Sequence, residues 1–164
     1  MKVQGFSDNP KLEFLYIHNR AKYPHLPEHL FDGDHAILLE DFHYTDKRGR
    51  THTAPKGMIT DGGSIPKRMW RRLTSPFRQL LPAYLIHDHY CQRARDVKDG
   101  KLRRKLRKDA DKLLAEMIAW ITKNLPMVKI KRRSKALIYA GVRFGAAGEE
   151  IKRFFGAKYD SSPH

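Results

Sequence analysis

The sequence contains one cysteine, Cys91, so no disulfide can form within the chain. It also lacks any run near the roughly 18 uninterrupted apolar residues of a membrane-spanning helix. Its first residues lack the apolar core of a secretory signal. These absences argue against a disulfide-stabilised scaffold and against a membrane-spanning helix in this sequence. We expect a soluble protein that is made and kept in a cytoplasm unless a larger assembly carries it out.

Acidic residues are scarce, with 18 Asp and Glu against 33 Lys and Arg, which gives a formal net charge of +15. Much of the positive charge lies in three runs: KRMWRR at 67–72, KLRRKLRK at 101–108 and KIKRRSK at 129–135. A surface of this sign attracts polyanions such as nucleic acid, anionic lipid headgroups or acidic proteins. No helix-turn-helix, zinc-finger or RNP signature accompanies the runs, so the sequence favours nonspecific contact with DNA or another polyanion over reading of bases.

The first part of the chain has the pattern of short strands and turns. Prolines and glycines punctuate residues 1–34, which we interpret as an extended N-terminal arm with one candidate strand at 12–17. Residues 36–45 and 51–60 suit strands, and DKRGR at 46–50 suits the loop of a hairpin between them. We therefore predict a small antiparallel sheet in this part of the chain.

The later part of the chain has the pattern of packed helices. Pro82 suits the first turn of a helix that runs to about Arg95. A longer helix is predicted from about Leu102 to Asn124. Its apolar side chains recur at intervals of three and four residues: Leu102, Leu106, Ala110, Leu113, Leu114, Met117, Ile118 and Ile121. This stripe predicts that the longer helix packs against its neighbours along one face.

The predicted fold class is α+β, with a small antiparallel sheet followed by a helical half. At 164 residues the chain is long enough for one domain with a hydrophobic core and short for two. We place that single domain at 35–156, with a last helical segment that ends near Phe155 and a flexible tail at 157–164.

The segment LIHDHYCQ at 85–92 places His87 and Asp88 on the first predicted helix, with a tyrosine and the cysteine close by. Adjacent side chains on a helix diverge by about 100°, so these two cannot share a hydrogen bond without distortion. They can instead serve neighbouring groups: a neutral imidazole takes a proton from water while the carboxylate holds a cation. The acid that orients such a base would come from the longer helix, where Asp109 and Asp111 both lie beside the apolar stripe.

The turn TDGGS at 60–64 precedes this helix in the sequence. Asp61 and the backbone carbonyls around Gly62 and Gly63 have the chemistry to bind a hard cation together with Asp88. The backbone amides of the same turn could instead form an anion-binding nest. Ser64 could cap the following turn, or bind a ligand.

An ordered set of motifs resembles a bacterial and phage family of unknown function, DUF1353. The set is PKGMITDGGSIP, then HDHY, then RKDAD, then YAGVRFG, and the likeness covers roughly residues 36–145. Members share a Thr-Asp-Gly turn, a His-Asp helix with a tyrosine, and a later Ala-Asp. The resemblance implies a phage or prophage origin and supplies no activity.

A second likeness is local. A glycine-rich loop, a helix with His-Asp and a tyrosine, and an antiparallel helix with an aspartate are similar to the calcium-dependent phospholipase A2 site. The resemblance implies His87 as the base, Asp111 as its orienting acid and Tyr90 as a supporting hydroxyl. It also implies Asp88 as a calcium ligand, with Gly62 and Gly63 in the cation loop. The disulfides of the secreted enzymes are absent here, and the gap from loop to helix is longer.

Two classes of function follow. The first is a metal-assisted ester hydrolase with calcium as the candidate cation, which requires His87, Asp88 and an acid of the longer helix to face one solvent-accessible pocket. The second is a noncatalytic phage virion component, such as a tail or neck accessory protein. Its basic surfaces would contact DNA or acidic phage structural proteins, and its His-Asp cluster would stabilise the fold. Such a protein would be located in the host cytoplasm and then in the virion.

Overall fold

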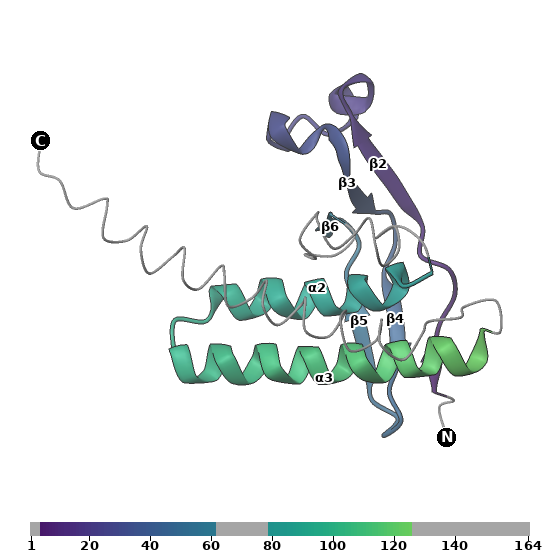
Figure 1. The fold of residues 1–164 in the computed structure, drawn as a ribbon. Helices are drawn as coiled ribbons and strands as arrows, with labels where there is room; N and C mark the ends of the chain where they lie inside the picture. Colours follow the sequence, from purple (N-terminus) through teal and green to yellow (C-terminus); the bar gives the residue numbers. More distant parts are fainter. Residues whose placement is uncertain (1–3, 62–78, 126–164) are drawn as a thin grey trace, which may run out of the picture.

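The computed structural model describes residues 4–61 and 79–125. The first range holds two three-stranded antiparallel sheets, and the second holds two long helices that lie side by side (Figure 1). The predicted α+β class is therefore confirmed. The predicted last helical segment and tail lie outside the described residues, as do Gly62, Gly63 and Ser64.

One sheet has the strand order β1–β4–β5 and the other has the order β2–β3–β6. All neighbouring strands in both sheets are antiparallel. The strands are β1 (Gly5–Phe6), β2 (Leu12–Tyr16), β3 (Asp32–Leu38), β4 (Phe42–Thr45), β5 (Thr51–Ala54) and β6 (Ile59–Thr60). Two 3-10 helices, η1 (Ile17–Lys22) and η2 (Glu28–Leu30), connect β2 to β3.

The predicted strand at 36–45 is interrupted, so the chain forms two sheets where the sequence predicted one. Strand β3 ends at Leu38, whose amide donates to the carbonyl of Met58 at 2.9 Å. The Asp41 carboxylate then accepts from the amide of Lys56 at 2.8 Å and closes the turn before β4. Strands β4 and β5 form the predicted hairpin around residues 46–50.

The first 34 residues contribute strands to both sheets. Strand β1 pairs with β4, and β2, within the strand predicted at 12–17, pairs with β3. Leu15, Phe31 and Ile37 form a small apolar cluster of their own. This cluster holds the β2–β3 end of the molecule together apart from the main core.

The two helices have nearly the predicted bounds: α2 spans Leu81–Asp96 and α3 spans Gly100–Asn124. Pro82 lies in the first turn of α2, where its missing N–H costs no hydrogen bond. Asp99 caps α3 by accepting from the amide of Lys101 at 2.8 Å. The short connection between the helices makes them antiparallel neighbours, which lets side chains of α2 and α3 meet along their length (Figure 1).

The main core joins both helices to the β1–β4–β5 sheet. It includes Phe42 and Tyr44 of β4, the buried face of α2, and the α3 stripe from Leu113 to Ile121. Each fully buried apolar side chain of this size stabilises the fold by roughly 1.5–3 kcal/mol relative to exposure. The predicted stripe does not extend to the start of α3, because Leu102 is 44% exposed.

Gly5 allows the N-terminal strand to approach α3. Its φ is 147°, and a Cβ at this position would lie 2.7 Å from Cζ2 of Trp120. We expect Gly5→Ala to lower the free energy of unfolding by about 1–3 kcal/mol, measured by urea denaturation. Gly49→Ala is the matched control, because Gly49 also has a positive φ, 76°, but no atom lies within 4 Å of a Cβ placed there. Equal losses in the two variants would exclude the contact with Trp120 as the cause.

Candidate functional site

His87 lies on α2 and faces α3, where it meets Asp111. Its Nε2 atom is 3.1 Å from Oδ1 of Asp111. The Asp109 side chain is instead 54% exposed, and its Oδ1 atom is 3.4 Å from Nζ of Lys112. Of the two acids that the sequence left open, the structure therefore places Asp111 beside His87.

Asp88 is close to His87 but is bonded to the sheet. Its Oδ1 atom is 3.7 Å from Nδ1 of His87, which is too long for a hydrogen bond, so the two groups interact mainly through charge. Its Oδ2 atom accepts a hydrogen bond from Oγ1 of Thr60 at 2.9 Å. Thr60 is the last residue of β6 and the first of the TDGGS turn, so this bond brings the start of that turn to α2. Asp61, the next residue, is half-buried.

The His87 cluster, defined as His87, Asp88 and Asp111, is buried. The three residues are only 5%, 7% and 6% exposed. Removing a charged group from water costs several kcal/mol unless it is paired, and each member of this cluster has a partner. The cluster therefore converges inside the protein, where it joins α2 to α3 and, through Thr60, to the β2–β3–β6 sheet.

The surroundings of His87 determine its charge. Burial lowers the pKa of the imidazole, but contacts with Asp111, Asp88 and Cys91 raise it more, so this pKa lies well above the usual value. This shift favours the protonated imidazole, and a protonated imidazole cannot take a proton from water. The geometry suits an ion-pair network better than a general base.

Cys91 lies one turn after His87 and is partly exposed. Its Sγ atom is 3.5 Å from Nε2 and 3.9 Å from Nδ1 of His87. Because the two distances are nearly equal, the sulfur is not in line with the N–H or lone-pair direction of either nitrogen. The Asp111 carboxylate also approaches Nε2, so the three side chains do not form the nucleophile–base–acid order of a catalytic triad.

The raised pKa of His87 predicts a pH dependence of stability. A histidine whose folded-state pKa exceeds its unfolded value of about 6.5 contributes all of its stabilisation below that pH. The contribution is lost as the pH rises from about 6.5 through the folded-state pKa. We expect the free energy of unfolding, measured by urea denaturation, to fall as the pH is raised above neutrality. In Asp111→Asn the free energy of unfolding should depend less on pH in this range. An unchanged pH dependence in that variant would contradict the pairing of His87 with Asp111.

Tyr90 was predicted to support His87, but the structure gives its hydroxyl a different partner. Its Oη atom is 2.8 Å from Nδ1 of His52, because α2 packs on β5 and brings that strand's imidazole within reach. The other ring nitrogen of His52, Nε2, is 3.2 Å from Oδ2 of Asp46. Nothing in the sequence pairs His52 with Tyr90, since 38 positions separate them.

Asp46 begins the loop between β4 and β5 and is only 2% exposed. Its carboxylate accepts hydrogen bonds from the amides of Arg48 and Arg50, both at 2.9 Å, and from Nε of Arg50 at 2.8 Å. Burial raises the pKa of this carboxyl, but the hydrogen bonds from Arg50, His52 and Arg48 lower it more, so the net pKa lies far below the usual value. Asp46 therefore stays ionised and fixes the shape of the hairpin loop.

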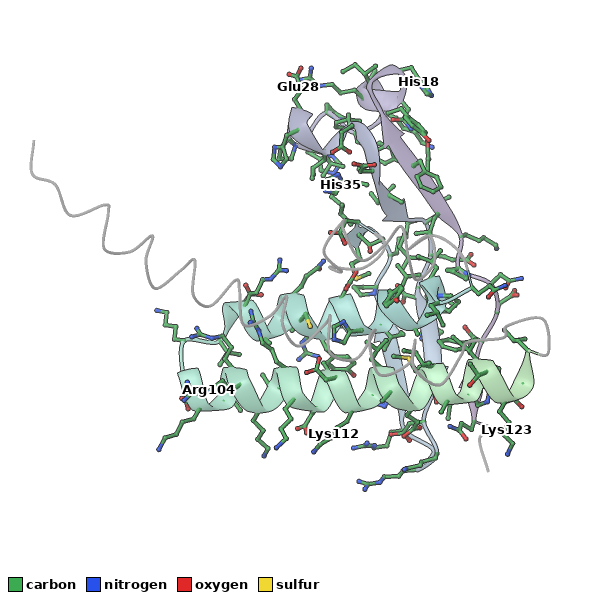
Figure 2. The ribbon with its side chains drawn as sticks, in the orientation of Figure 1. His18, Glu28, His35, Arg104, Lys112 and Lys123 are labelled. Carbon is green, nitrogen blue, oxygen red and sulfur yellow. The ribbon has the colours of Figure 1, made fainter. Side chains whose placement is uncertain are left out.

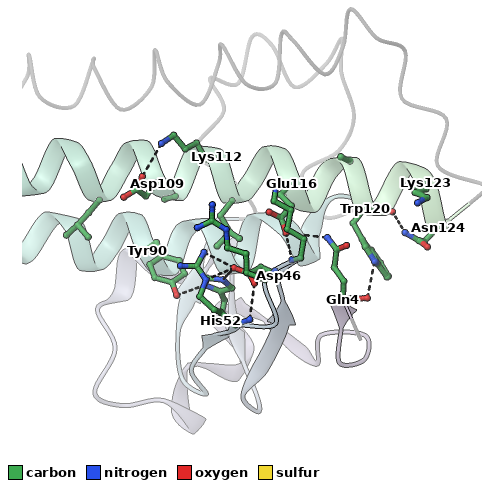
Figure 3. Close-up of a pocket in the computed structure, with 17 residues that line it drawn as sticks. Gln4, Asp46, His52, Tyr90, Asp109, Lys112, Glu116, Trp120, Lys123 and Asn124 are labelled. Carbon is green, nitrogen blue, oxygen red and sulfur yellow. Dashed lines mark hydrogen bonds and ion pairs between the residues drawn. The ribbon is translucent and has the colours of Figure 1, made fainter. Parts of the chain in front are cut away.

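A groove of about 1140 Å³ lies between this hairpin and α3 (Figure 3). Its lining includes Tyr90, His52 and Asp46 on one side, and Trp120 on α3. Five basic residues also line it: Lys47, Arg48, Arg50, Lys112 and Lys123. None of the His87 cluster lines this groove. The sequence predicted the hairpin but gave no signal for the groove, because the groove forms where segments far apart in the chain meet.

Basic side chains also follow the solvent side of α3. The basic face of α3 is defined as Lys101, Arg104, Lys105, Lys108 and Lys112, all exposed and spaced at intervals of three and four residues. Figure 2 shows Lys112 on the side of α3 away from α2. Five exposed cations on one face of the helix make a positive surface. The basic run in the sequence could not by itself show that these side chains share an exposed face.

Two searches for other features gave negative results within residues 4–61 and 79–125. No group of three or more His, Cys, Asp and Glu side chains there is arranged to hold a metal ion. No helix in the same ranges has the length and apolarity needed to cross a bilayer.

Comparisons with known proteins identify a family but no activity. The model of the DUF1353 family, described as a protein of unknown function, matches residues 36–142. The uncharacterized protein y4iH of Sinorhizobium fredii is 38% identical over 63 residues, which are 38% of this chain and 26% of y4iH. The chain therefore spans about a quarter of that relative's length. No solved structure matches the chain.

Proposed function

The chain belongs to the DUF1353 family of unknown function, and on that premise we propose that it is a noncatalytic protein that binds polyanions through the basic face of α3. One contrast carries the proposal. The His87 cluster, which was expected to hold the base, its orienting acid and a cation ligand, is buried and paired, whereas five cations on α3 are exposed. The His87 cluster is then a stabilising network that holds α3 in place.

The dimensions of the basic face suit a phosphate backbone. Lys101 and Lys112 are 11 residues apart, which corresponds to about 17 Å along a helix that rises 1.5 Å per residue. One strand of DNA places a phosphate about every 3.4 Å, so this face can contact about five phosphates. Such contacts carry no base information, which agrees with the nonspecific binding predicted from the basic runs.

Binding of a fluorescein-labelled DNA duplex of random sequence, followed by anisotropy at about 50 mM salt, tests the proposal directly. We expect a micromolar or tighter dissociation constant that does not depend on the base sequence. An absence of binding at this salt concentration would overturn the proposal.

A phage particle is the setting that we propose for this binding. The support is the resemblance of the TDGGS turn and the His-Asp helix to a family of bacterial and phage proteins. In a virion the basic face would contact packaged DNA or acidic structural proteins of the tail or neck. Mass spectrometry of purified particles should detect the protein, and its absence from them would exclude this role.

A second candidate function, calcium-dependent ester hydrolysis, is favoured by one contact. The Thr60–Asp88 hydrogen bond brings the start of the TDGGS turn to the proposed calcium ligand Asp88, with Asp61 following directly. This candidate predicts that calcium raises the Tm of the native protein and not that of Asp88→Asn. A Tm that calcium leaves unchanged, together with no ester cleavage, would exclude it.

A further inference from the structure

The hydrogen-bonded chain Tyr90–His52–Asp46 has no role in the function proposed above. Its two links are 2.8 Å and 3.2 Å long. All three side chains line the groove between the β4–β5 hairpin and α3, and Figure 3 shows them on the hairpin side of it. The chain therefore joins a buried carboxylate to a hydroxyl at a basic groove.

The direction of these hydrogen bonds depends on the charge of His52. Asp46 is ionised and accepts, so Nε2 of His52 carries a hydrogen. In a neutral imidazole Nδ1 is then an acceptor, and the Tyr90 hydroxyl donates to it. In a protonated imidazole Nδ1–H donates to Oη of Tyr90, and the hydroxyl hydrogen is released to another acceptor. Burial raises the pKa of Tyr90, so its hydroxyl keeps that hydrogen in both states.

Charged and titratable groups contact His52 directly or contact one of its neighbouring side chains. Asp46 and Arg50 come from the hairpin loop, and the Tyr44 ring of β4 stacks at 6.4 Å. Tyr90 comes from α2, where Arg93 acts on it electrostatically. From α3, Glu116 accepts from the Tyr44 hydroxyl at 3.3 Å. Asp46 is the acidic group in direct contact with His52.

The groove has charge that complements a phosphate. Its three acids already have partners: Asp46 binds Arg50 and His52, Asp109 approaches Lys112, and Glu116 accepts from Gln4, Tyr44 and the amide of Lys47. Lys47, Arg48 and Lys123 also line the groove, and none of them forms an ion pair with a carboxylate in the part of the chain that the structure describes. An incoming anion would therefore meet cations whose charge is not neutralised.

We propose that the Tyr90 hydroxyl binds a phosphate of a nucleic-acid backbone in this groove, and that protonation of His52 turns the hydroxyl from the imidazole to the phosphate. The inference rests on the proposed polyanion binding and adds to it a defined subsite beside the basic face of α3. It makes binding in the groove couple to the uptake of a proton. Binding by the basic face alone does not involve Tyr90 or His52.

The test compares native protein with Tyr90→Phe, which keeps the aromatic ring and removes the hydroxyl. Binding of a labelled oligothymidylate is measured by anisotropy at constant ionic strength, across the pH range in which histidines titrate. A hydrogen bond to a charged group corresponds to about tenfold in affinity, so near pH 6 we expect the native protein to bind about tenfold tighter than Tyr90→Phe. Near pH 8 the two affinities should converge.

Matched variants and ligands separate the alternatives. His52→Gln should lose the same pH dependence, whereas His43→Gln, which removes the half-buried imidazole of neighbouring β4, should keep it. Millimolar inorganic phosphate should displace the oligonucleotide equally from the native protein and from Tyr90→Phe. If phosphate competes better with the native protein, free phosphate binds through Tyr90 and the assignment of a nucleic-acid backbone to this subsite is wrong. Equal pH profiles of native protein and Tyr90→Phe would overturn this inference and leave binding by α3 intact. No oligonucleotide binding by any variant would overturn the proposed function itself.

Discussion

Replacing Asp111 with alanine is expected to lower the free energy of unfolding by about 3–5 kcal/mol, the cost of breaking a buried ion pair by removing one partner. The variant leaves a buried imidazole whose nearest remaining carboxylate, Asp88, is 3.7 Å away and already bonded to Thr60. Alanine keeps the helix propensity of α3, so the loss would report the pair and not the helix. Urea denaturation of the purified variant measures it.

Asp109→Ala is the matched control for this experiment. Asp109 lies two positions before Asp111 on the same helix, but it is exposed, and its ion-pair partner among the residues that the structure describes is Lys112. Surface pairs of this kind contribute about 0–1 kcal/mol. Similar losses in the two variants would show that the His87–Asp111 contact does not stabilise the fold, and the structural role assigned to the His87 cluster would then be wrong.

The affinity for duplex DNA is expected to fall about 500-fold when salt is raised from 50 to 200 mM. The reason is that each phosphate contact releases condensed counterions, with a slope of about −0.9 in log affinity against log salt per contact. Five contacts by the basic face of α3 give a slope of about −4.5. Anisotropy titrations at four or five salt concentrations measure it, and a slope near zero would exclude the phosphate backbone as the ligand.

The helices and the hairpin could be predicted from the sequence because their signals are local. Each element is predicted by a pattern of a few neighbouring residues. These patterns are Pro82 at the start of α2, the apolar stripe from Leu113 to Ile121 in α3, and the loop at 46–50. The division into two sheets was missed because it depends on turns at both ends of the β4–β5 hairpin. The Asp41–Lys56 hydrogen bond, for example, joins residues 15 positions apart. Strand propensity depends on neighbouring residues and cannot predict such a contact.

The candidate site was harder to predict than the fold. Helical spacing identified His87, Asp88 and the pair of acids from which Asp111 comes, but it could not show that the cluster is buried. Exposure depends on how α2, α3 and β6 pack together. The hydrogen bond between Tyr90 and His52 joins a helix to a strand. The sequence shows that a tyrosine and a histidine are present, but no spacing pattern predicts that they meet.

The most direct test of the proposed function compares two triple alanine variants that both have a formal charge of +12, three less than the native +15. One removes Arg104, Lys105 and Lys108 from the basic face of α3. The other removes Lys11, Lys22 and Lys56, which are exposed in the sheet part of the protein. We predict that the first variant lowers the magnitude of the salt slope from about 4.5 to about 1.8, while the second keeps the native slope. Equal slopes in the two variants would contradict the assignment of polyanion binding to this face of α3.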